Sequence, residues 1–235
     1  AAGALDIAVG AAPRDVKPKR DWVSAERAFI SIPGIAASVS GERAARAEPY
    51  VKEVFFRAAA GDRLVFPSNN VEKCGNVISQ APDRDSAALA AERAARAVRI
   101  RLAPRNPDTE AFLAGGGIPN PDGTTWPPSA FRVSPDLAAA ASALPDRGLP
   151  SRTGAASGSR PRVAYAILSG IEQEPSRDWQ GRGIAESLKL VEEWTGIVPD
   201  DGRTELVLGS TFWRALFRGG CQGAAYVVDS LFPGG

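Results

Sequence analysis

Residues 64–102, LVFPSNNVEKCGNVISQAPDRDSAALAAERAARAVRIRL, decide the fold that we predict for this chain. The stretch starts with an apolar run, passes through a polar loop and becomes apolar again at Val77–Ser79. A turn signal follows, after which Asp85 or Ser86 can accept from the free amides of an alanine-rich helix. The alternation at Arg99–Leu102 is typical of a half-buried strand. The predicted order is therefore strand, loop, strand, helix, strand.

The residues before this stretch repeat the same order of elements. The hexapeptide Glu-Arg-Ala-Ala-Arg-Ala occurs at 42–47 and again at 92–97, each time on a predicted helix between predicted strands. Two successive β-α-β units predict an α/β (α+β) fold, with a ferredoxin-like split β-α-β sheet in the N-terminal half and both helices on one face. Convergence by composition in an alanine- and arginine-rich chain explains the repeat equally well and leaves the order unchanged. The predicted elements are a strand at 29–39 broken at Pro33-Gly34, a helix at Glu42–Ala47, and a strand at Val51–Arg57 with Leu64–Phe66 as the second arm of a hairpin.

The composition changes after residue 103. Proline, glycine and serine are frequent from 104 to 161, apart from a helix predicted at Pro135–Leu144, which Ser134 can cap. We therefore predict three parts: an α/β domain at 1–103, a Pro/Gly-rich connection with one helix at 104–161, and a second, smaller α/β block at 162–235. The elements predicted in the last part are a strand at Val163–Leu168, a helix at Gly183–Trp194, a strand at Glu205–Leu208, a helix from Ser210 to Phe217 and a buried strand at Ala225–Val228.

Composition excludes several classes of function. The 235 residues are 44% hydrophobic and 23% charged with a net charge of +1, which gives no sign of binding to nucleic acid or a membrane. No apolar run approaches the length of a membrane span and no signal-peptide pattern is visible, so we expect a cytoplasmic protein. The chain contains no His, which excludes Ser-His-Asp and Cys-His nucleophilic sites. Cys74 and Cys221 lack metal-ligand spacing, so we expect buried free thiols and no metal site.

The polar loop in the first stretch is the main candidate site. Asn69, Asn70, Glu72 and Lys73 offer amide donors, a carboxylate and an ammonium within a few residues, and such a loop between strands can contact a polar ligand. Asn also tolerates turn dihedral angles, so a purely structural role explains the same residues. Cys74 has no His to accept its proton, which argues against a nucleophilic role.

A second candidate lies near the predicted helix at 183–194. An exposed Trp179 between Asp178 and Arg182 could stack on a planar ligand, or it could simply cover the helix. Arg214 and Arg218, four residues apart on a predicted helix, could face an anionic partner or form a solvated face.

The N-terminal half contains a series of short motifs: Ile32-Pro33-Gly34-Ile35, Val51–Phe56, Gly61-Asp62-Arg63, Cys74–Ser79 and the helix within 85–100. Through these motifs it resembles the C-terminal subdomain of ATP-grasp carboxylate–amine ligases over about residues 28–102. The resemblance implies a subdomain that closes over ATP and an amino-acid substrate, in an enzyme that makes an acyl phosphate which an amine then attacks. It implies ATP and Mg²⁺ as cofactors, and small-molecule carboxylate and amine substrates.

Three functional hypotheses follow. The first is the C-terminal portion of an ATP-grasp ligase, catalytically incomplete as this chain, with Lys52, Arg57 and the loop residues Asn69, Asn70, Glu72 and Lys73 contacting substrate or phosphate. The second is a non-catalytic accessory or interaction domain within a homo- or hetero-oligomer. The third is a His-free enzyme with a carboxylate–cation site, formed by Glu72 and Lys73 or by Asp178 and Arg182. The absence of Met is consistent with a processed or fragment terminus.

Overall fold

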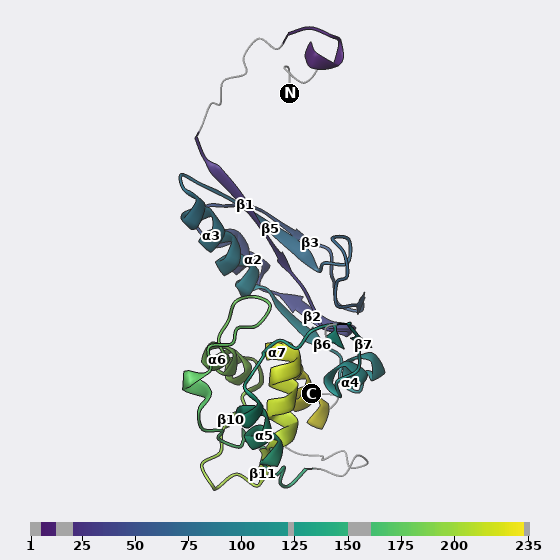
Figure 1. The fold of residues 1–235 in the computed structure, drawn as a ribbon, viewed down its shortest axis with the longest axis vertical. Coiled ribbons are helices and arrows are strands. Elements are labelled where there is room, and N and C mark those ends of the chain that lie inside the picture. The colour runs from purple at the N-terminus through teal and green to yellow at the C-terminus, as the bar shows by residue number, and fades with distance from the viewer. Residues whose placement is uncertain (1–5, 13–20, 122–124, 150–160, 233–235) are drawn as a thin grey trace.

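The structure is a computed structural model that describes residues 6–12, 21–121, 125–149 and 161–232. Its N-terminal half contains two three-stranded antiparallel sheets, with helices on one face (Figure 1). Strand β5 (Gly75–Ala81) lies between β1 (Val23–Phe29) and β3 (Val51–Phe56), and all of these pairings are antiparallel. Strand β2 (Gly34–Ser40) lies between β4 (Arg63–Leu64) and β6 (Arg99–Leu102).

The two sheets together have the predicted split β-α-β connectivity. Strand β2 follows β1 directly after the Pro33-Gly34 break, so the chain passes from the sheet of order β1-β5-β3 into the sheet of order β4-β2-β6. Helices α2 (Glu42–Ala47) and α3 (Arg84–Ala97) contact each other and pack on the sheet. The buried face of α3 consists of alanines, which lack long side chains and allow the helix to lie close to the strands. The predicted α+β class is confirmed.

The predicted hairpin between Val51–Arg57 and Leu64–Phe66 is wrong. Strand β4 pairs with β2, not with β3. The turn at Gly61-Asp62 brings the chain to β2 through two backbone hydrogen bonds. The amide of Gly61 donates to the carbonyl of Ala36 on β2 over 2.8 Å, and the amide of Ala36 donates to the carbonyl of Asp62 over 2.9 Å.

The C-terminal half is built from helices around a short parallel sheet. Strand β9 (Val163–Tyr165) pairs with β10 (Val198–Pro199) and with β11 (Leu206–Leu208). Two helices lie in the proline-rich connection, α4 (Pro107–Leu113) and α5 (Pro135–Ala143), where the sequence predicted only the second. The remaining elements are β7 (Ile118–Pro119), β8 (Thr125–Trp126), a 3-10 turn at Ile171–Gln173, α6 (Ile184–Thr195) and α7 (Ser210–Leu231).

The buried strand predicted at Ala225–Val228 is wrong, because these residues continue α7. Gly220 does depart from helical geometry, with φ 59° and ψ −151°, but the helix resumes beyond it. A short apolar run does not distinguish a buried strand from a buried helix, and α7 is buried along most of its length. None of the helices in the described part of the chain is long and apolar enough to span a membrane.

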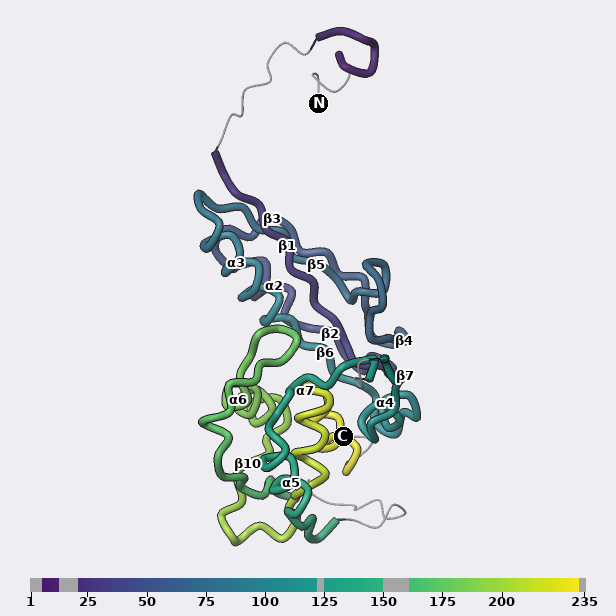
Figure 2. Tube along the Cα trace, viewed as in Figure 1, coloured from purple at the N-terminus to yellow at the C-terminus, as the bar shows by residue number. Residues whose placement is uncertain are grey.

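Helix α7 connects the two halves, and Figure 2 shows it lying next to β6. The side chain of Gln222 accepts from the amide of Ile32 over 3.2 Å and donates to the hydroxyl of Ser31 over 3.0 Å. Tyr226 belongs to the hydrophobic cluster of the N-terminal half, while most of α7 packs in the C-terminal cluster. The division of the chain at 103/104 and 161/162 stays a prediction.

Candidate functional site

The polar loop between β4 and β5 is a connector, as predicted, and its side chains hold its own backbone. The side-chain oxygen of Asn69 accepts from the amides of Val71 over 2.8 Å and Glu72 over 3.3 Å, which is an Asx turn. The carboxylate of Glu72 accepts from the amide of Ser68 over 2.7 Å and from its hydroxyl over 2.9 Å. These hydrogen bonds lower the pKa of Glu72. The loop is therefore ordered by its own polar groups.

Arg57, which follows β3 directly, donates hydrogen bonds to backbone carbonyls of the loop. Its Nη1 donates to the carbonyl of Val71 over 3.2 Å and lies 3.5 Å from the carbonyl of Asn70. The guanidinium is exposed and has further N–H groups that these carbonyls do not use. Asn70 is also exposed, and its side chain has no hydrogen bond to another described residue.

An open hollow of about 360 Å³ lies beside this loop. Three cationic side chains line it, from Arg57, Arg63 and Lys73, together with the carboxylates of Asp62 and Glu72. Both carboxylates already accept from backbone amides, Asp62 from Ala59 over 2.8 Å and Glu72 from Ser68. Arg63 pairs with Asp108 over 2.9 Å and Lys73 with Glu26 over 3.2 Å, so Arg57 is the one of the three cations without a carboxylate partner among the described residues. Its guanidinium can hold the carboxylate or phosphate group of a ligand.

Both predicted site lysines have partners outside the hollow. The Nζ of Lys73 lies 3.2 Å from a carboxylate oxygen of Glu26 on β1, so its ammonium is partly neutralised. Lys52 lies over the ring of Trp22, 5.6 Å from its centroid. It is at the opposite end of β3 from Arg57 and is not brought to the loop.

Cys74 ends the loop and is buried against the sheet. Burial raises the pKa of its thiol to about 12, so the thiol is protonated at neutral pH. Cys221 is also a buried free thiol, and burial raises its pKa too. The predicted buried free thiols are confirmed.

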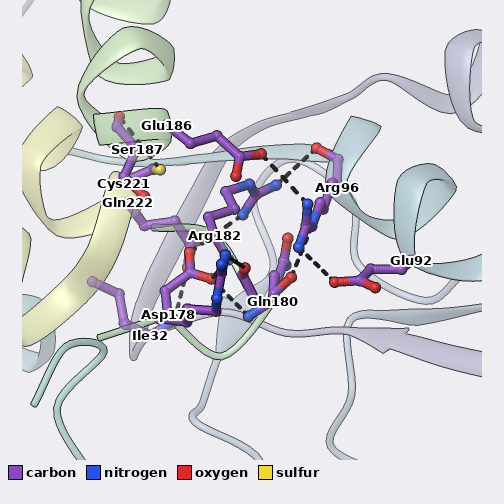
Figure 3. Close-up of polar contacts among 12 residues, drawn as sticks. Ile32, Glu92, Arg96, Asp178, Gln180, Arg182, Glu186, Ser187, Cys221 and Gln222 are labelled. Carbon is purple, nitrogen blue, oxygen red and sulfur yellow. Dashed lines mark hydrogen bonds and ion pairs between the residues drawn. The ribbon is translucent and has the colours of Figure 1, made fainter. Parts of the chain in front are cut away.

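The second candidate lies where the two halves meet (Figure 3). Asp178 and Arg182 form an ion pair with 3.5 Å between Oδ2 and Nη1, and their side chains are only 6% and 5% exposed. The other carboxylate oxygen of Asp178 accepts from the amides of Gln180 over 2.8 Å and Arg182 over 2.9 Å. The segment from Asp178 to Arg182 is thus a closed loop directly before α6.

Two arginines exchange hydrogen bonds across the junction. Arg182 donates from Nη2 to the backbone carbonyl of Arg96 on α3 over 2.8 Å, and Arg96 donates from Nε to the carbonyl of Gln180 over 2.9 Å. Arg96 also pairs with Glu92 on its own helix and with Glu186 on α6, as Figure 3 shows. We call these reciprocal contacts the arginine clasp.

A glycine makes the close approach in the clasp possible. Gly181 has φ +79°, and a Cβ there would lie 2.7 Å from Glu92 Oε1 and 2.8 Å from Arg96 Nη2. Only glycine adopts this conformation without strain and leaves room for both side chains.

The predicted exposure of Trp179 is wrong. The side chain is half-buried, with its ring centroid 5.0 Å from that of Phe66 and 6.5 Å from that of Phe112. Buried atoms at the junction without a hydrogen-bond partner include Trp179 Nε1, Arg182 Nε and Ser187 Oγ. The space beside them is about 30 Å³, which admits only water-sized molecules. The geometry therefore favours a structural role for this second candidate.

Sequence reasoning missed Arg96, Glu186 and Gln222. The sequence did contain a signal for Arg96, because both copies of the repeated hexapeptide have a Glu and an Arg four residues apart. Both ion pairs form in the structure, Arg46 with Glu42 and Arg96 with Glu92. Arg46 of the first copy reaches β3, where it donates to the carbonyl of Val54, whereas Arg96 of the second copy reaches the C-terminal half. The pattern could not show this difference.

The hollow beside the loop offers the cationic Arg57 as a donor for phosphate oxygens. Nowhere in the described ranges do three or more Asp, Glu or Cys side chains gather as a candidate metal-ligand set.

Residues 28–103 are similar to a family model of C-terminal subdomains of ATP-grasp ligases. The model is described as L-amino acid ligase C-terminal domain 2, and the match covers about a third of the chain. Searches of curated proteins and of solved structures found no match.

Proposed function

We propose that this chain supplies the C-terminal part of an ATP-grasp ligase that joins a carboxylate to an amine through an acyl phosphate. The match of residues 28–103 to the L-amino acid ligase domain carries the proposal, and it points to amino acids as substrates. Because such a ligase consumes ATP, the proposal places the protein in the cytoplasm.

The proposed substrate contacts lie in the hollow beside the loop. Arg57 and Lys73 receive the negatively charged group of the substrate or nucleotide, with Arg57 as the principal donor because Lys73 is shared with Glu26. Asn70 presents its free side-chain amide at the edge. Asn69 and Glu72 act indirectly, since their side chains hold the backbone of the loop in place.

The open face of the sheet supports the idea that further parts of the ligase pack against this subdomain. Helices α2 and α3 cover one face of β1, β5 and β3. On the other face Phe55, a large apolar residue of the edge strand β3, is 49% exposed. We propose that the catalytic part of the enzyme covers this face.

ATP, when bound, would supply the phosphoryl group of the acyl phosphate, with Mg²⁺ neutralising the phosphate charge. We assign no magnesium ligand to the residues described above. The proposed ligase therefore takes its metal site from another polypeptide segment, and this chain by itself is catalytically incomplete.

The test is amino-acid-dependent release of phosphate from ATP by the product of the complete reading frame that encodes this chain. We expect release with a panel of L-amino acids and none with the 235-residue chain alone. Arg57→Gln in the complete product should lower kcat/KM by about tenfold, because a charged hydrogen bond to substrate contributes roughly 1.5–3 kcal/mol. Arg43→Gln is the matched control, since Arg43 is exposed on α2 away from the hollow.

Either of two outcomes would contradict the proposal. The first is a complete product that releases no phosphate with any amino acid or other small amine and carboxylate. The second is full activity of the 235-residue chain alone, which would refute catalytic incompleteness while leaving the ligase chemistry intact.

A further inference from the structure

A pocket in the C-terminal half, outside the residues that match the ligase domain, is lined by arginines without acids. It has a volume of about 590 Å³ and lies between the end of α4, the helix α5 and the helix α7 (Figure 1). Arg132, Arg214 and Arg218 line it together with the hydroxyl-bearing side chains of Ser129 and Ser142. None of the described residues that line it is Asp or Glu.

The innermost of these arginines carries a buried charge with no carboxylate against it. Arg218 is 9% exposed. It donates to the carbonyls of Phe112 over 3.0 Å, Pro127 over 2.8 Å and Gly116 over 2.9 Å, and lies 3.4 Å from the hydroxyl of Ser129. All of these acceptors are neutral, and no acidic side chain pairs with Arg218 in the described part of the chain.

Neutral acceptors satisfy the N–H groups of Arg218 but leave its positive charge in place. Burial lowers the pKa of Arg218, yet arginine starts so high that it stays protonated in proteins. A cation in a partly desolvated position acts over a longer range than one in water. The floor of the pocket is therefore positive.

The two outer arginines add to this charge. Arg132 and Arg214 are exposed, and within the described residues neither side chain forms an ion pair or hydrogen bond. Arg214 and Arg218 are four residues apart on α7, so they project from the same side of the helix and repel each other. An anion between the three arginines would remove that repulsion and complete the charge balance.

We propose that this pocket binds a small molecule through an oxyanion group, a carboxylate or a phosphate, which Arg132 and Arg214 contact directly above the buried charge of Arg218. The pocket is separate from the hollow beside the β4–β5 loop, so the two would bind different groups. The inference does not depend on the ligase chemistry proposed above.

The test is titration of the 235-residue chain with inorganic phosphate and, separately, with succinate, followed by calorimetry and by thermal unfolding. Sodium chloride at equal ionic strength is the reference, because a general salt effect would appear there too. We expect saturable binding of at least one of the two anions, with a rise in Tm that follows the ligand concentration as linkage requires. If only one of the two anions shows saturable binding, it identifies the class of ligand: phosphate-bearing for phosphate, carboxylate-bearing for succinate.

Arg214→Gln and Arg132→Gln should each weaken that binding by about tenfold, the effect of losing one charged hydrogen bond. Both side chains are exposed, so the unfolding midpoint without ligand should not change, and it is measured to show that the variants are folded. Arg203→Gln is the matched control, because Arg203 is exposed on a different loop and its side chain has no partner among the described residues.

The proposal would be overturned if neither phosphate nor succinate showed saturable binding in excess of the effect of sodium chloride. An equal loss of binding in Arg203→Gln would overturn it as well, since that result means a diffuse charge effect. Neither measurement involves ATP or amino-acid turnover, so failure here leaves the proposed ligase function unaffected.

Discussion

Replacing Asp178 by Asn removes one charge from the ion pair at the junction while preserving its shape. The amide oxygen of Asn can still accept from the backbone amides of Gln180 and Arg182, which the carboxylate holds at 2.8 Å and 2.9 Å. What is lost is the counter-charge of Arg182, whose side chain is only 5% exposed. Asp178→Asn therefore isolates the effect of an unpaired buried cation.

The magnitude follows from burial and from the few other partners of Arg182. Removing one member of a buried ion pair costs about 3–5 kcal/mol, because the remaining charge is left desolvated. Arg182 has one other side-chain hydrogen bond, to the carbonyl of Arg96, and its Nε has no partner. We expect Asp178→Asn to lower the free energy of unfolding by about 3 kcal/mol, the low end of that range, since the backbone contacts survive.

The assay is urea unfolding of the 235-residue chain, followed by tryptophan fluorescence and by far-UV circular dichroism to check that the two transitions coincide. Arg182→Met and the double variant complete a mutant cycle. We expect the double variant to be more stable than the sum of the single effects by about 2 kcal/mol, because it buries no unpaired charge. Glu42→Gln is the control, since the Glu42–Arg46 pair is exposed and should contribute less than about 1 kcal/mol.

A cost below about 1 kcal/mol for Asp178→Asn would refute the reasoning. Strict additivity in the cycle would do the same, because it would mean that the two side chains do not interact.

Three further predictions concern positions elsewhere in the chain. Gly220→Ala should lower the free energy of unfolding by about 1–3 kcal/mol, because Gly220 has φ 59° inside α7; an unchanged urea midpoint would contradict this. The pKa of Glu72 is lowered in the folded chain. The ionised carboxylate therefore contributes its full stabilisation above the pKa of the unfolded chain, and this stabilisation is lost as the pH falls through the pKa of the folded chain. The difference in urea midpoint between wild type and Glu72→Gln should therefore be constant above about pH 5.5 and shrink below the ordinary glutamate pKa of 4.5; a difference independent of pH would show that the charge is irrelevant. Cys74 and Cys221 should react with a thiol reagent at pH 8 only in denaturant, since both are buried with raised pKa values; rapid labelling of the native chain would contradict their burial.

The sequence predicted the N-terminal half well because its signals are local and mutually consistent. Helix α3 has an alanine run and a following strand with strict alternation, and the structure has both. The predicted cap, Asp85 or Ser86, is wrong: Asp83 caps the helix, and its side chain accepts from the amide of Ser86. The hairpin failed because pairing of β4 depends on hydrogen bonds with Ala36, far away in the sequence. No local pattern could show which strand a turn joins.

The C-terminal half was harder to predict because its elements are buried on several sides. An element surrounded by apolar neighbours loses the period that distinguishes helix from strand, as the second half of α7 demonstrates. Helix α4 was overlooked although Asn106 caps it and Pro107 begins it, because prolines and glycines nearby indicated a connection without regular structure.

The candidate site was predicted in its residue types and not in its contacts. The loop residues lie together as expected, because they are neighbours in the chain. The direction of Lys73 toward Glu26 depends on the pairing of β1 with β5, which brings Glu26 opposite Ile78. The arginine clasp depends on how the two halves of the chain pack against each other. No pattern in the sequence indicates which residues of the two halves meet.

The contacts of α7 have a consequence for how such genes can recombine. Gln222 binds the backbone next to the Pro33-Gly34 break, and Asp229 pairs with Arg101 on β6. A genetic crossover near residue 103 between two diverged relatives would join the N-terminal sheets of one protein to helix α7 of the other. That helix would carry side chains adapted to different sheets. Inherited changes at Gln222 and Asp229 should therefore be accompanied by changes at Ser31 and Arg101, and the two regions should share one evolutionary history.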